Sequence, residues 1–443
     1  MSTARTAGTG TIPTRRSSIK WILMLGALAA LPAITTDMYL PSLPVVAEDL
    51  GTTQAAAQFT MSGMLIGAGV GQLVIGPFSD RFGRRLPLLI GISLHVVTSV
   101  LCSITPDIGT LIGLRVCQGF FNAAASVVAI AVIRDRFVGS DAARLLSRLM
   151  LVIGVAPLFA PTVGQAISGA WQWRAVFYAL ALIGLFLVLI VWRFMPESLP
   201  RDQRRPGNPR QVAGGYAALL RDRHFMALAV IPGLGLAVIM SYVVGSPFVF
   251  QDEYGLDQGQ FAAVFALNGA AIVGSAQLNA ALVRRAAPIR VLRIAVIVQM
   301  VCALVLLAIA LTGFGGIVGL VAGLWLVLGT QGMIPANASV LALHNYGHMA
   351  GTAAAVIGSL QSGVAGLVSP FVGLLGGDSV AMVCVMLVAV SLTLMVLAVG
   401  TPAYRTGGWR ERDGMEPGPT TSAAGTEERE AEQVEAQGPD QRG

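Results

Sequence analysis

The stretch "GPFSDRFGRR", Gly76 to Arg85, joins two apolar runs, 55–79 and 86–104. Each run has about the 20 residues that a helix needs to cross the hydrocarbon of a bilayer. Within the stretch, Gly83 permits a tight reversal of the chain, and the arginines hold the loop on the cytoplasmic side. Asp80 can interact with the N-terminus of a neighbouring helix. The stretch therefore predicts a charged turn between two membrane-spanning helices.

The composition of the whole chain extends this interpretation. Of its 443 residues, 55% are hydrophobic and only 12% are charged, and the mean hydropathy is +0.72. Average soluble domains carry about 25% charged residues. The strands of membrane barrels alternate apolar and polar residues, and these apolar runs do not. The sequence predicts an all-α polytopic membrane protein.

Twelve apolar runs are long enough to be spans, and they form two sets of six. The expected spans of the first half are 20–42, 55–79, 86–104, 109–133, 144–168 and 174–194. Those of the second half are 225–249, 260–283, 289–311, 316–340, 350–375 and 379–400. This arrangement is typical of duplicated transporter halves. We expect a cytoplasmic N-terminal arm (1–19), a first six-helix half (20–195), a cytoplasmic central loop (196–223), a second six-helix half (224–400) and an acidic tail (401–443).

Cations gather in alternate loops, and this asymmetry sets the expected orientation. The basic loops hold Lys20, Arg81, Arg84, Arg85, Arg134, Arg136, Arg144, Arg148, Arg284, Arg285, Arg290 and Arg293, together with the arginines of the central loop. The opposite loops are acidic, and Arg174 is their only cation. We therefore expect an inner-membrane protein with both termini in the cytoplasm. The tail combines glutamates with Gly, Pro, Ser and Thr and lacks apolar periodicity, so we expect it to be disordered.

Several classes of function lack their sequence requirements. The arginines form no basic patch with interleaved aromatic residues, as nucleic-acid binding would need. The only lysine, Lys20, follows Ile19 rather than glycine, so the chain has no P-loop. His344 and His348 have a metal-like spacing, but "HNYGH" lacks the glutamate of H-E-x-x-H, so we expect no metal and no cofactor. A channel would need a ring of like charges or a selectivity loop.

Two charged residues, Asp37 and Arg115, lie clearly inside expected spans, where hydrocarbon cannot solvate a charge. At 1.5 Å per residue, Asp37 lies about 10 Å and Arg115 about 12 Å below the same outer surface. Two interpretations stay open. The residues form either a static ion pair between the first and fourth spans or a site in an aqueous cavity where the carboxylate loads and releases a proton.

Three motifs resemble those of the major facilitator superfamily. G-x-x-x-D-R-x-G-R-R, in 76–85, resembles its signature loop, and "RVCQG", 115–119, resembles its span-four motif. "GVAPLFAPTVGQ", 154–165, resembles the span-five motif of drug/proton antiporters. The resemblance implies a cytoplasmic gate and an antiporter helix. The gate residues are Gly76, Asp80, Arg81, Gly83, Arg84 and Arg85, and those of the antiporter helix are Gly154, Pro157, Pro161 and Gly164.

The span-five motif also fits a simpler role. Its Gly and Pro residues share one helix face, where Gly allows close packing and Pro bends the helix. A kinked packing helix without a directional role would have the same pattern. The motif usually closes with two glycines, and here Gln165 follows Gly164. In the second half, "NAALVRRAAPIR" keeps the arginines but lacks the D-R-x-G core, so Asp80 has no expected twin.

"TDMYLP", 36–41, and "SPFVFQDEYGLDQGQF", 246–261, narrow the resemblance to the bicyclomycin/chloramphenicol-resistance branch of drug:proton antiporters. The resemblance implies the major facilitator fold, with spans 1, 4, 7 and 10 around a central cavity. It also implies that Asp37 is the proton-linked acid and that Arg115 is its basic partner. The candidate cavity and substrate residues are Tyr39, Gln118, Asn122, Tyr242, Asn268, Gln331, Asn337 and Gln361. Each of these neutral residues could instead hold helices together.

The expected function is export of small amphipathic drugs or antibiotics by proton antiport. Without ATP chemistry, an ion gradient must drive transport. The alternative is proton-coupled uptake or efflux of a neutral metabolite by the same fold. An integral-membrane enzyme lacks a supporting motif. We expect the chain to act as a monomer whose partners are a small-molecule substrate, protons and the lipid bilayer, without nucleic acid.

Overall fold

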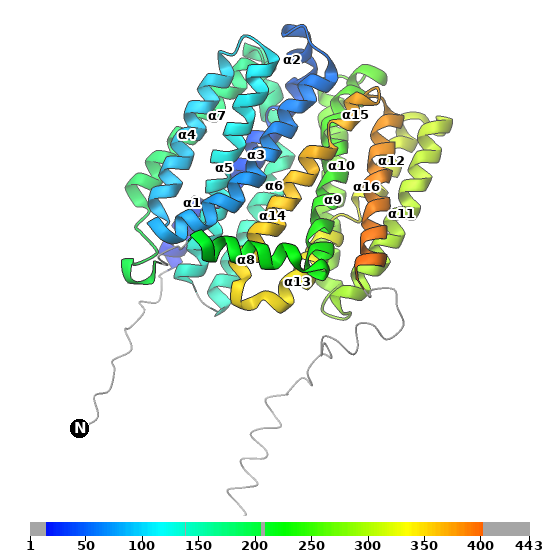
Figure 1. Cartoon of the computed structure of the whole chain (residues 1–443). Helices are drawn as coiled ribbons and strands as arrows, with labels where there is room; N and C mark the ends of the chain where they lie inside the picture. Colours follow the sequence, from blue (N-terminus) through cyan, green and yellow to red (C-terminus); the bar gives the residue numbers. More distant parts are fainter. Residues whose placement is uncertain (1–14, 138, 205–208, 402–443) are drawn as a thin grey trace, which may run out of the picture. The chain divides into compact units, whose positions relative to one another are not determined.

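The computed structural model describes residues 15–137, 139–204 and 209–401, which contain helices and no β-strand (Figure 1). The first half has α1 (Arg15–Asp37), η1 (Leu40–Ser42), α2 (Leu43–Asp49), α3 (Gln54–Phe82), α4 (Arg85–Ser103), α5 (Ile108–Arg136), α6 (Gly139–Trp171) and α7 (Arg174–Phe194). The connection has η2 (Arg201–Gln203) and α8 (Pro209–Arg221). The second half has α9 (Arg223–Pro247), η3 (Phe248–Glu253), α10 (Gln258–Leu282), α11 (Pro288–Thr312), α12 (Gly316–Leu328), α13 (Ile334–Leu343), η4 (His344–Met349), α14 (Ala350–Val368), α15 (Phe371–Leu374) and α16 (Ser379–Gly400).

Ten helices of the described residues are long and apolar enough to cross a membrane. Two further expected spans, 144–168 and 316–340, coincide with α6, a helix of 33 residues, and with the pair α12 and α13. The prediction of an all-α membrane protein with twelve spans in two sets of six is therefore confirmed.

The first span differs from its expected course. It was expected to continue to residue 42, but α1 ends at Asp37. Pro41 and Pro44 lie in the first turns of η1 and α2, which follow. A proline lacks the N–H that would continue a helix but fits a helix start. The proline positions therefore explain why Asp37 becomes the last residue of α1.

The tenth span also differs, because it consists of two helices rather than one. α12 ends at Leu328 and α13 begins at Ile334. Between them, the Gly332 N–H donates to Ser275 Oγ on α10 at 2.9 Å. Pro335 follows in the first turn of α13 and cannot donate a helical hydrogen bond. The contact of Gly332 with α10 and the missing N–H of Pro335 therefore both contribute to the break.

Some predictions lie outside the described residues. These are the arm before residue 15, residues 205–208 of the central loop, the tail beyond residue 401, the side chains of Lys20, Arg144, Pro157 and His348, and the surroundings of Gly154. The part of the expected arm that is described, 15–19, is helical and belongs to α1.

Two helices of the first half, α3 and α5, pack with their backbones in close contact. A Cβ added at Gly67 on α3 would lie 2.0 Å from the carbonyl oxygen of Val116 on α5. A Cβ at Gly119 on α5 would lie 1.9 Å from the carbonyl oxygen of Met64. Small residues are the usual means by which helices approach in membranes. The two glycines therefore set the distance between α3 and α5.

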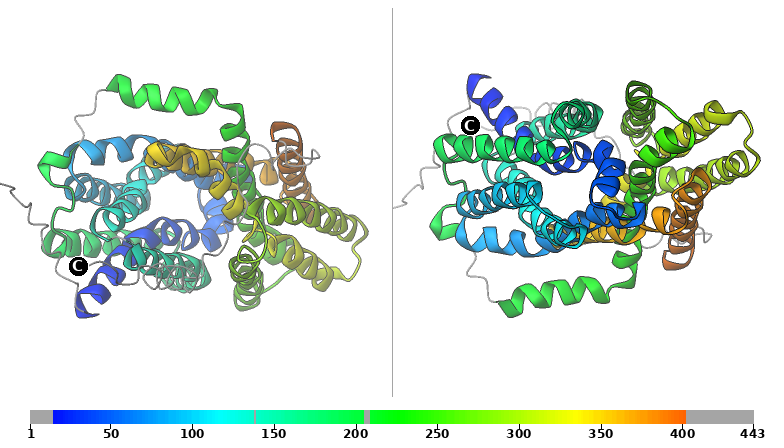
Figure 2. Two further views of the ribbon diagram at one scale, coloured as in Figure 1. Left: turned by 90° about the horizontal axis from the view of Figure 1, so that it is seen from below. Right: turned by 90° about the horizontal axis from the view of Figure 1, so that it is seen from above.

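The two ends of the bundle differ in charge. We call the end that carries α8 the basic end and the end that carries α2 the acidic end, at the bottom and top of Figure 1. Arg84 directly precedes α4, and Asp49 is the last residue of α2. Figure 2 shows the helices from the basic end on the left and from the acidic end on the right. α3 of the first half packs along α14 of the second half. We call this contact the seam.

Hydrogen bonds between neutral groups join α3 to α14 and to the residues that follow it, which include α15. Near the acidic end, the Gly373 N–H donates to Gln58 Oε1 at 2.8 Å, and the hydroxyl oxygens of Ser62 and Ser369 lie 3.3 Å apart. Further toward the basic end, Gln72 Nε2 donates to the Ser362 hydroxyl at 3.2 Å. The seam thus joins the halves from the acidic end to the middle of the bundle.

Candidate functional site

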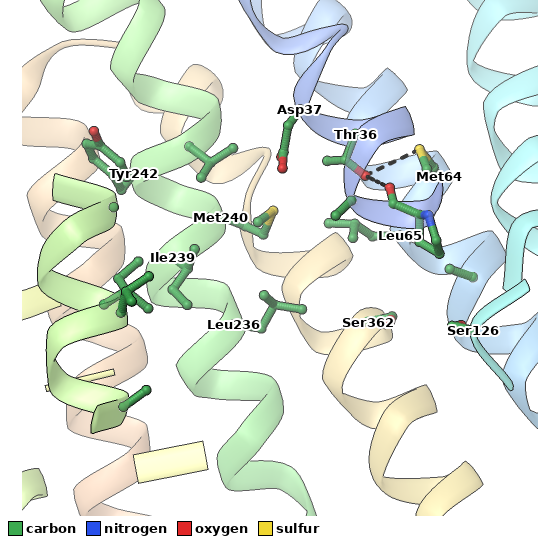
Figure 3. Close-up of a pocket in the computed structure, with 18 of the residues that line it drawn as sticks. Thr36, Asp37, Met64, Leu65, Ser126, Leu236, Ile239, Met240, Tyr242 and Ser362 are labelled. Atoms are coloured by element: carbon green, nitrogen blue, oxygen red, sulfur yellow. Dashed lines mark hydrogen bonds between the residues drawn. The ribbon is translucent and has the colours of Figure 1, made fainter. Parts of the chain in front are cut away.

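A cavity of about 930 Å³ lies between the two halves. Its walls come from α1, α3, α5 and α6 on one side and from α9, α10 and α14 on the other (Figure 3). Most of the wall is apolar. The polar residues of the wall are Thr36, Asp37, Gln72, Asn122, Ser126, Arg148, Tyr242, Gln277 and Ser362.

The cavity is closed toward the acidic end and open toward the basic end. Asp37, Met240 and Tyr242, which lie deepest, are 6%, 8% and 2% exposed. Arg148 and Gln277, which line the cavity nearer the basic end, are exposed. The seam bonds near the acidic end lie beyond the deep residues. The structure therefore represents a state in which the site is accessible from the basic end.

Asp37 places a carboxylate at the deep end of this cavity. It is the last residue of α1, and Figure 3 shows its side chain directed into the cavity, opposite Met240 and Tyr242. The neighbouring Thr36 hydroxyl donates to the carbonyl of Pro32 at 2.9 Å rather than to Asp37. No described residue donates a hydrogen bond to the Asp37 carboxylate or forms an ion pair with it. The carboxylate therefore faces the cavity.

Arg115 lies on α5, fully buried inside the first half. Its Nη1 donates to Gln118 Oε1 at 2.7 Å, and Gln118 Nε2 donates to the Ser99 hydroxyl at 2.7 Å. The guanidinium carbon lies 4.7 Å from the centre of the Tyr39 ring and 5.7 Å from that of Phe177. The faces of aromatic rings attract cations. The faces of these two rings and the amide oxygen of Gln118 therefore stabilise the charge of Arg115.

The static ion pair between Asp37 and Arg115, one of the two interpretations left open by the sequence, is absent from the described contacts. α1 ends at Asp37, whose side chain lines the cavity, and the ring of Tyr39, two residues later, packs against Arg115. The first half therefore places an aromatic ring, and not the carboxylate, beside the guanidinium. Similar depth in the membrane did not bring the two charges together.

Two of the eight expected cavity residues, Asn122 and Tyr242, line the cavity. The six that do not are Tyr39, Gln118, Asn268, Gln331, Asn337 and Gln361. Several of these hold other groups: Asn268 Nδ2 donates to the Tyr242 hydroxyl at 3.3 Å, and Asn337 Nδ2 donates to Asn279 Oδ1 at 2.6 Å. For these residues the geometry favours a role in helix packing.

Six polar wall residues were not among the expected site residues: Thr36, Gln72, Ser126, Arg148, Gln277 and Ser362. Arg148 was assigned to the basic loops, but α6 begins at Gly139 and carries it into the wall. One signal was available for Arg148, since it falls inside the expected span 144–168. For Ser126, the signal was its position one helical turn after Asn122 on the same face of α5.

Arg84 is the centre of an ionic cluster at the basic end. Its Nε donates to Asp135 Oδ2 at 2.8 Å, and its Nη1 donates to Asp80 Oδ1 at 2.5 Å and to the Ser79 hydroxyl at 2.8 Å. The Ser198 hydroxyl donates to Asp135 at 3.2 Å. Burial opposes the charge of Arg84, but the two carboxylates outweigh it and raise its pKa. The cluster ties the turn after α3 to the end of α5 and to the segment after α7.

Glu197 joins this cluster by capping α4. Its carboxylate accepts the backbone N–H groups of Arg84 at 2.7 Å, Ser198 at 3.0 Å, Leu199 at 3.1 Å and Arg85 at 3.3 Å. Burial alone would raise the pKa of Glu197, but these four donors outweigh it and hold the pKa below its ordinary value. The segment after α7 thus supplies the N-terminal cap that α4 lacks in its own sequence.

The other expected gate residues lie around the same turn. Gly83 has φ of +94°, a conformation that favours glycine. The Arg85 guanidinium donates to the carbonyl of Trp192 on α7. Arg81 is exposed, and a Cβ added at Gly76 would meet nothing within 4 Å. Gly83 therefore has a clear structural requirement, and Gly76 has none in this state.

α6 approaches the end of α1 at Gly164. A Cβ added there would lie 1.9 Å from the carbonyl oxygen of Met38, the residue that follows Asp37. Pro161 is buried three residues earlier. The two described members of the expected antiporter helix therefore lie against the segment that carries the candidate proton site.

The chain resembles known transporters over most of its length. The family model of the Major Facilitator Superfamily matches residues 25–370. "Uncharacterized MFS-type transporter YdgK" of Bacillus subtilis is 36% identical over 378 residues, which cover 85% of this chain and 94% of that protein. "Bicyclomycin resistance protein homolog" of Haemophilus influenzae is 30% identical over 367 residues, which cover 83% and 92%. The crystal structure of a D-xylose-proton symporter shares the fold with a TM-score of 0.66 at 18% identity, over 86% of this chain and 97% of that one.

Proposed function

The chain belongs to the Major Facilitator Superfamily of membrane transporters, and from this premise we propose that it exports small amphipathic compounds, drugs or antibiotics among them, in exchange for protons. One observation supports the proposal above the others: the carboxylate of Asp37, which has no partner among the described residues, lies at the closed end of a cavity that is open at the other end. An ionisable group inside a membrane bundle that faces such a cavity is a candidate relay for protons.

The cycle follows from this placement. With the cavity open at the basic end, Asp37 exchanges its proton with that side and the substrate enters. When the halves rearrange, the same carboxylate and the substrate become accessible from the acidic end. One proton charge that crosses a potential of 100 mV supplies about 2.3 kcal/mol. Arg115 acts within the first half, where it holds the Tyr39 ring and thereby the end of α1.

The chemistry of the wall supports an amphipathic substrate. Met64, Leu236 and Phe265 provide apolar surface. Asn122 is 2% exposed, and neither atom of its amide group has a hydrogen-bond partner among the described residues. A buried amide without partners costs free energy, so a substrate group with both a donor and an acceptor would be favoured beside it. Arg148 near the opening disfavours cationic compounds.

The relative named as a bicyclomycin resistance protein homolog supports the choice of drugs and antibiotics as the substrate class. Proton-coupled uptake or efflux of a neutral metabolite is the second candidate, because the neutral wall residues suit such a substrate equally well. The D-xylose-proton symporter supports only the fold.

The arginine-rich loops support an orientation with the basic end in the cytoplasm of the cell's inner membrane. In this orientation the structure is open to the cytoplasm, where an exporter takes up its substrate. Both termini, the N-terminal arm (1–19), the central loop (196–223) and the acidic tail (401–443) would then be cytoplasmic. We propose a monomer with two transporting halves, 20–195 and 224–400.

Reconstitution in proteoliposomes tests this function. An imposed proton gradient should drive a panel of fluorescent amphipathic compounds across the membrane, and a proton uncoupler should abolish the movement. Asp37→Asn should lose gradient-driven transport and keep substrate binding. Transport that an uncoupler leaves unchanged, or full gradient-driven transport by Asp37→Asn, would contradict the proposal. Movement of neutral metabolites alone would favour the second candidate.

A further inference from the structure

A helical carbonyl on α3 lacks its usual partner within the helix. The carbonyl oxygen of Leu73 would accept the N–H of residue 77 in a regular α-helix. Residue 77 is a proline inside α3, and proline has no N–H. The hydroxyl of Tyr216 on the connecting helix α8 donates to this carbonyl at 2.9 Å. The connection between the halves thus satisfies a group that Pro77 leaves free.

α8 packs with the second half of the chain. It contacts α9 and α14, its Leu219 is fully buried, and a Cβ added at Gly215 would lie 3.8 Å from Thr352. The helix runs across the direction of the spans at the basic end (Figure 1). Tyr216 therefore makes a hydrogen bond from an element of the second half to α3 of the first half.

The position of this bond along α3 is informative. Gln72, whose side chain donates to Ser362, is the residue before Leu73, and the described hydrogen bonds of the seam end there. Gln72 is also the last residue of α3 that lines the cavity. Tyr216 therefore contacts α3 where the cavity wall and the described hydrogen bonds of the seam both end.

Tyr216 remains a donor under ordinary conditions. Burial raises the pKa of its hydroxyl to about 12, with a further contribution from the nearby Asp80 carboxylate. The hydroxyl is therefore protonated at neutral pH, and its bond to Leu73 does not depend on the proton gradient.

We propose that α8 is a strap whose Tyr216–Leu73 bond holds the transporter in the state that is open at the basic end. Alternating access moves one half of such a transporter against the other around a central site. Closing the basic end moves α3 relative to the second half. The hydrogen bond from Tyr216 to the Leu73 carbonyl then breaks. Tyr216 thus acts as a positioning residue that sets the ratio of the two states, independently of which compound is transported.

The test measures this ratio in full-length protein without substrate. Spin labels at the exposed positions Phe82 and Leu282 report the width of the basic end by pulsed electron spin resonance. Tyr216→Phe keeps the ring and removes the donor. We expect it to shift the ratio of the two states by about three- to tenfold toward the narrow distance, the range that the loss of one neutral hydrogen bond allows.

A second substitution tests the physical cause. In Pro77→Ala, the N–H of an alanine at position 77 can donate to Leu73 within α3. Pro77→Ala alone should shift the ratio in the same direction, and adding Tyr216→Phe should then change it by less than twofold. Tyr178→Phe is the matched control, because Tyr178 is an exposed tyrosine on α7. It should leave the distances unchanged.

Three results would overturn the strap. They are unchanged distances in Tyr216→Phe, an equal effect of Tyr216→Phe in the native and Pro77→Ala backgrounds, and a lower melting temperature without any change in the ratio of the states. The distances are measured without a substrate or a proton gradient. A failure of the proposed drug export would therefore leave this test intact, and the reverse also holds.

Discussion

Asp37 and Tyr39 leave the end of the first span in opposite directions. The carboxylate of Asp37 lines the cavity, and the Tyr39 ring lies 4.7 Å from the guanidinium carbon of Arg115. The Tyr39 hydroxyl also lies 3.1 Å from the hydroxyl of Thr60 on α3. One side of this short segment thus faces the transport route, while the other anchors it in the first half. A change at Arg115 can therefore reach Asp37 through this segment.

We expect the double variant Asp37→Asn with Arg115→Gln to show no recovery. Asp37→Asn should lose proton coupling, and Arg115→Gln should lose the contacts with Tyr39, Phe177 and Gln118 and lower the melting temperature. Removing both members of a buried ion pair would avoid the cost of an orphaned charge, but Asp37 and Arg115 form no ion pair among the described contacts. Proteoliposome transport and thermal unfolding of both single variants and the double variant test this expectation. Near-normal coupled transport in the double variant would reinstate a static ion pair.

We expect Gly119→Ala to destabilise the first half by about 1–3 kcal/mol, the usual cost of overpacking. The added methyl would lie 1.9 Å from the carbonyl oxygen of Met64, so α3 and α5 must move apart. Gly113→Ala on the same helix is the control, because its methyl would meet nothing within 4 Å. Unfolding in detergent should distinguish the two variants. Equal melting temperatures would mean that the helices adjust without cost.

We expect stability to fall at acid pH through Glu197. Its folded pKa lies below the ordinary value of 4.5, so its contribution is present above that value and is lost as the pH falls through the folded pKa. The melting temperature of the native protein should exceed that of Glu197→Gln at neutral pH, and the difference should vanish at acid pH. Asp202→Asn, an exposed acid in η2, is the control. A difference that stays constant with pH would rule out the carboxylate as its cause.

We expect Asp80→Asn and Asp135→Asn to slow transport while substrate binding is retained. Both residues bind Arg84, and none of the three lines the cavity. Asp135→Asn should be the less stable variant. The side chain of Asp135 is 17% exposed and that of Asp80 is 46% exposed, and exposed ion pairs contribute only about 0–1 kcal/mol. Binding titrations, transport rates and melting temperatures separate these effects. Parallel loss of binding and transport would place the cluster at the substrate site instead.

Much of the architecture could be predicted from the sequence, because length and apolarity decide which segments span a membrane. The helix between Gly83 and Ser103 and the halves on either side of the central loop follow from such one-dimensional patterns. Breaks were harder to predict. The break in the span expected at 316–340 involves a contact of Gly332 with Ser275 on another helix, and a one-dimensional pattern does not contain such a contact.

The candidate site could be predicted in part. Depth follows from the number of residues to a helix end, and on this basis Asp37 and Arg115 were placed at one level. The direction of a side chain around its helix depends on neighbours from distant parts of the chain, and this direction separates the two charges. Arg148 differs from the prediction for another reason: α6 begins at Gly139, so that it carries Arg148 to the cavity rather than leaving it in a loop.

The seam between α3 and α14 is joined by amide and hydroxyl groups alone in the bonds described above, Gln58 to Gly373 and Ser62 to Ser369 near its closed end. Each such bond contributes only about 0.5–1.5 kcal/mol. Dissolved ions screen charges but have little to act on in a contact between neutral groups. Separation of α3 from α14 at the acidic end should therefore depend little on the salt concentration of the medium.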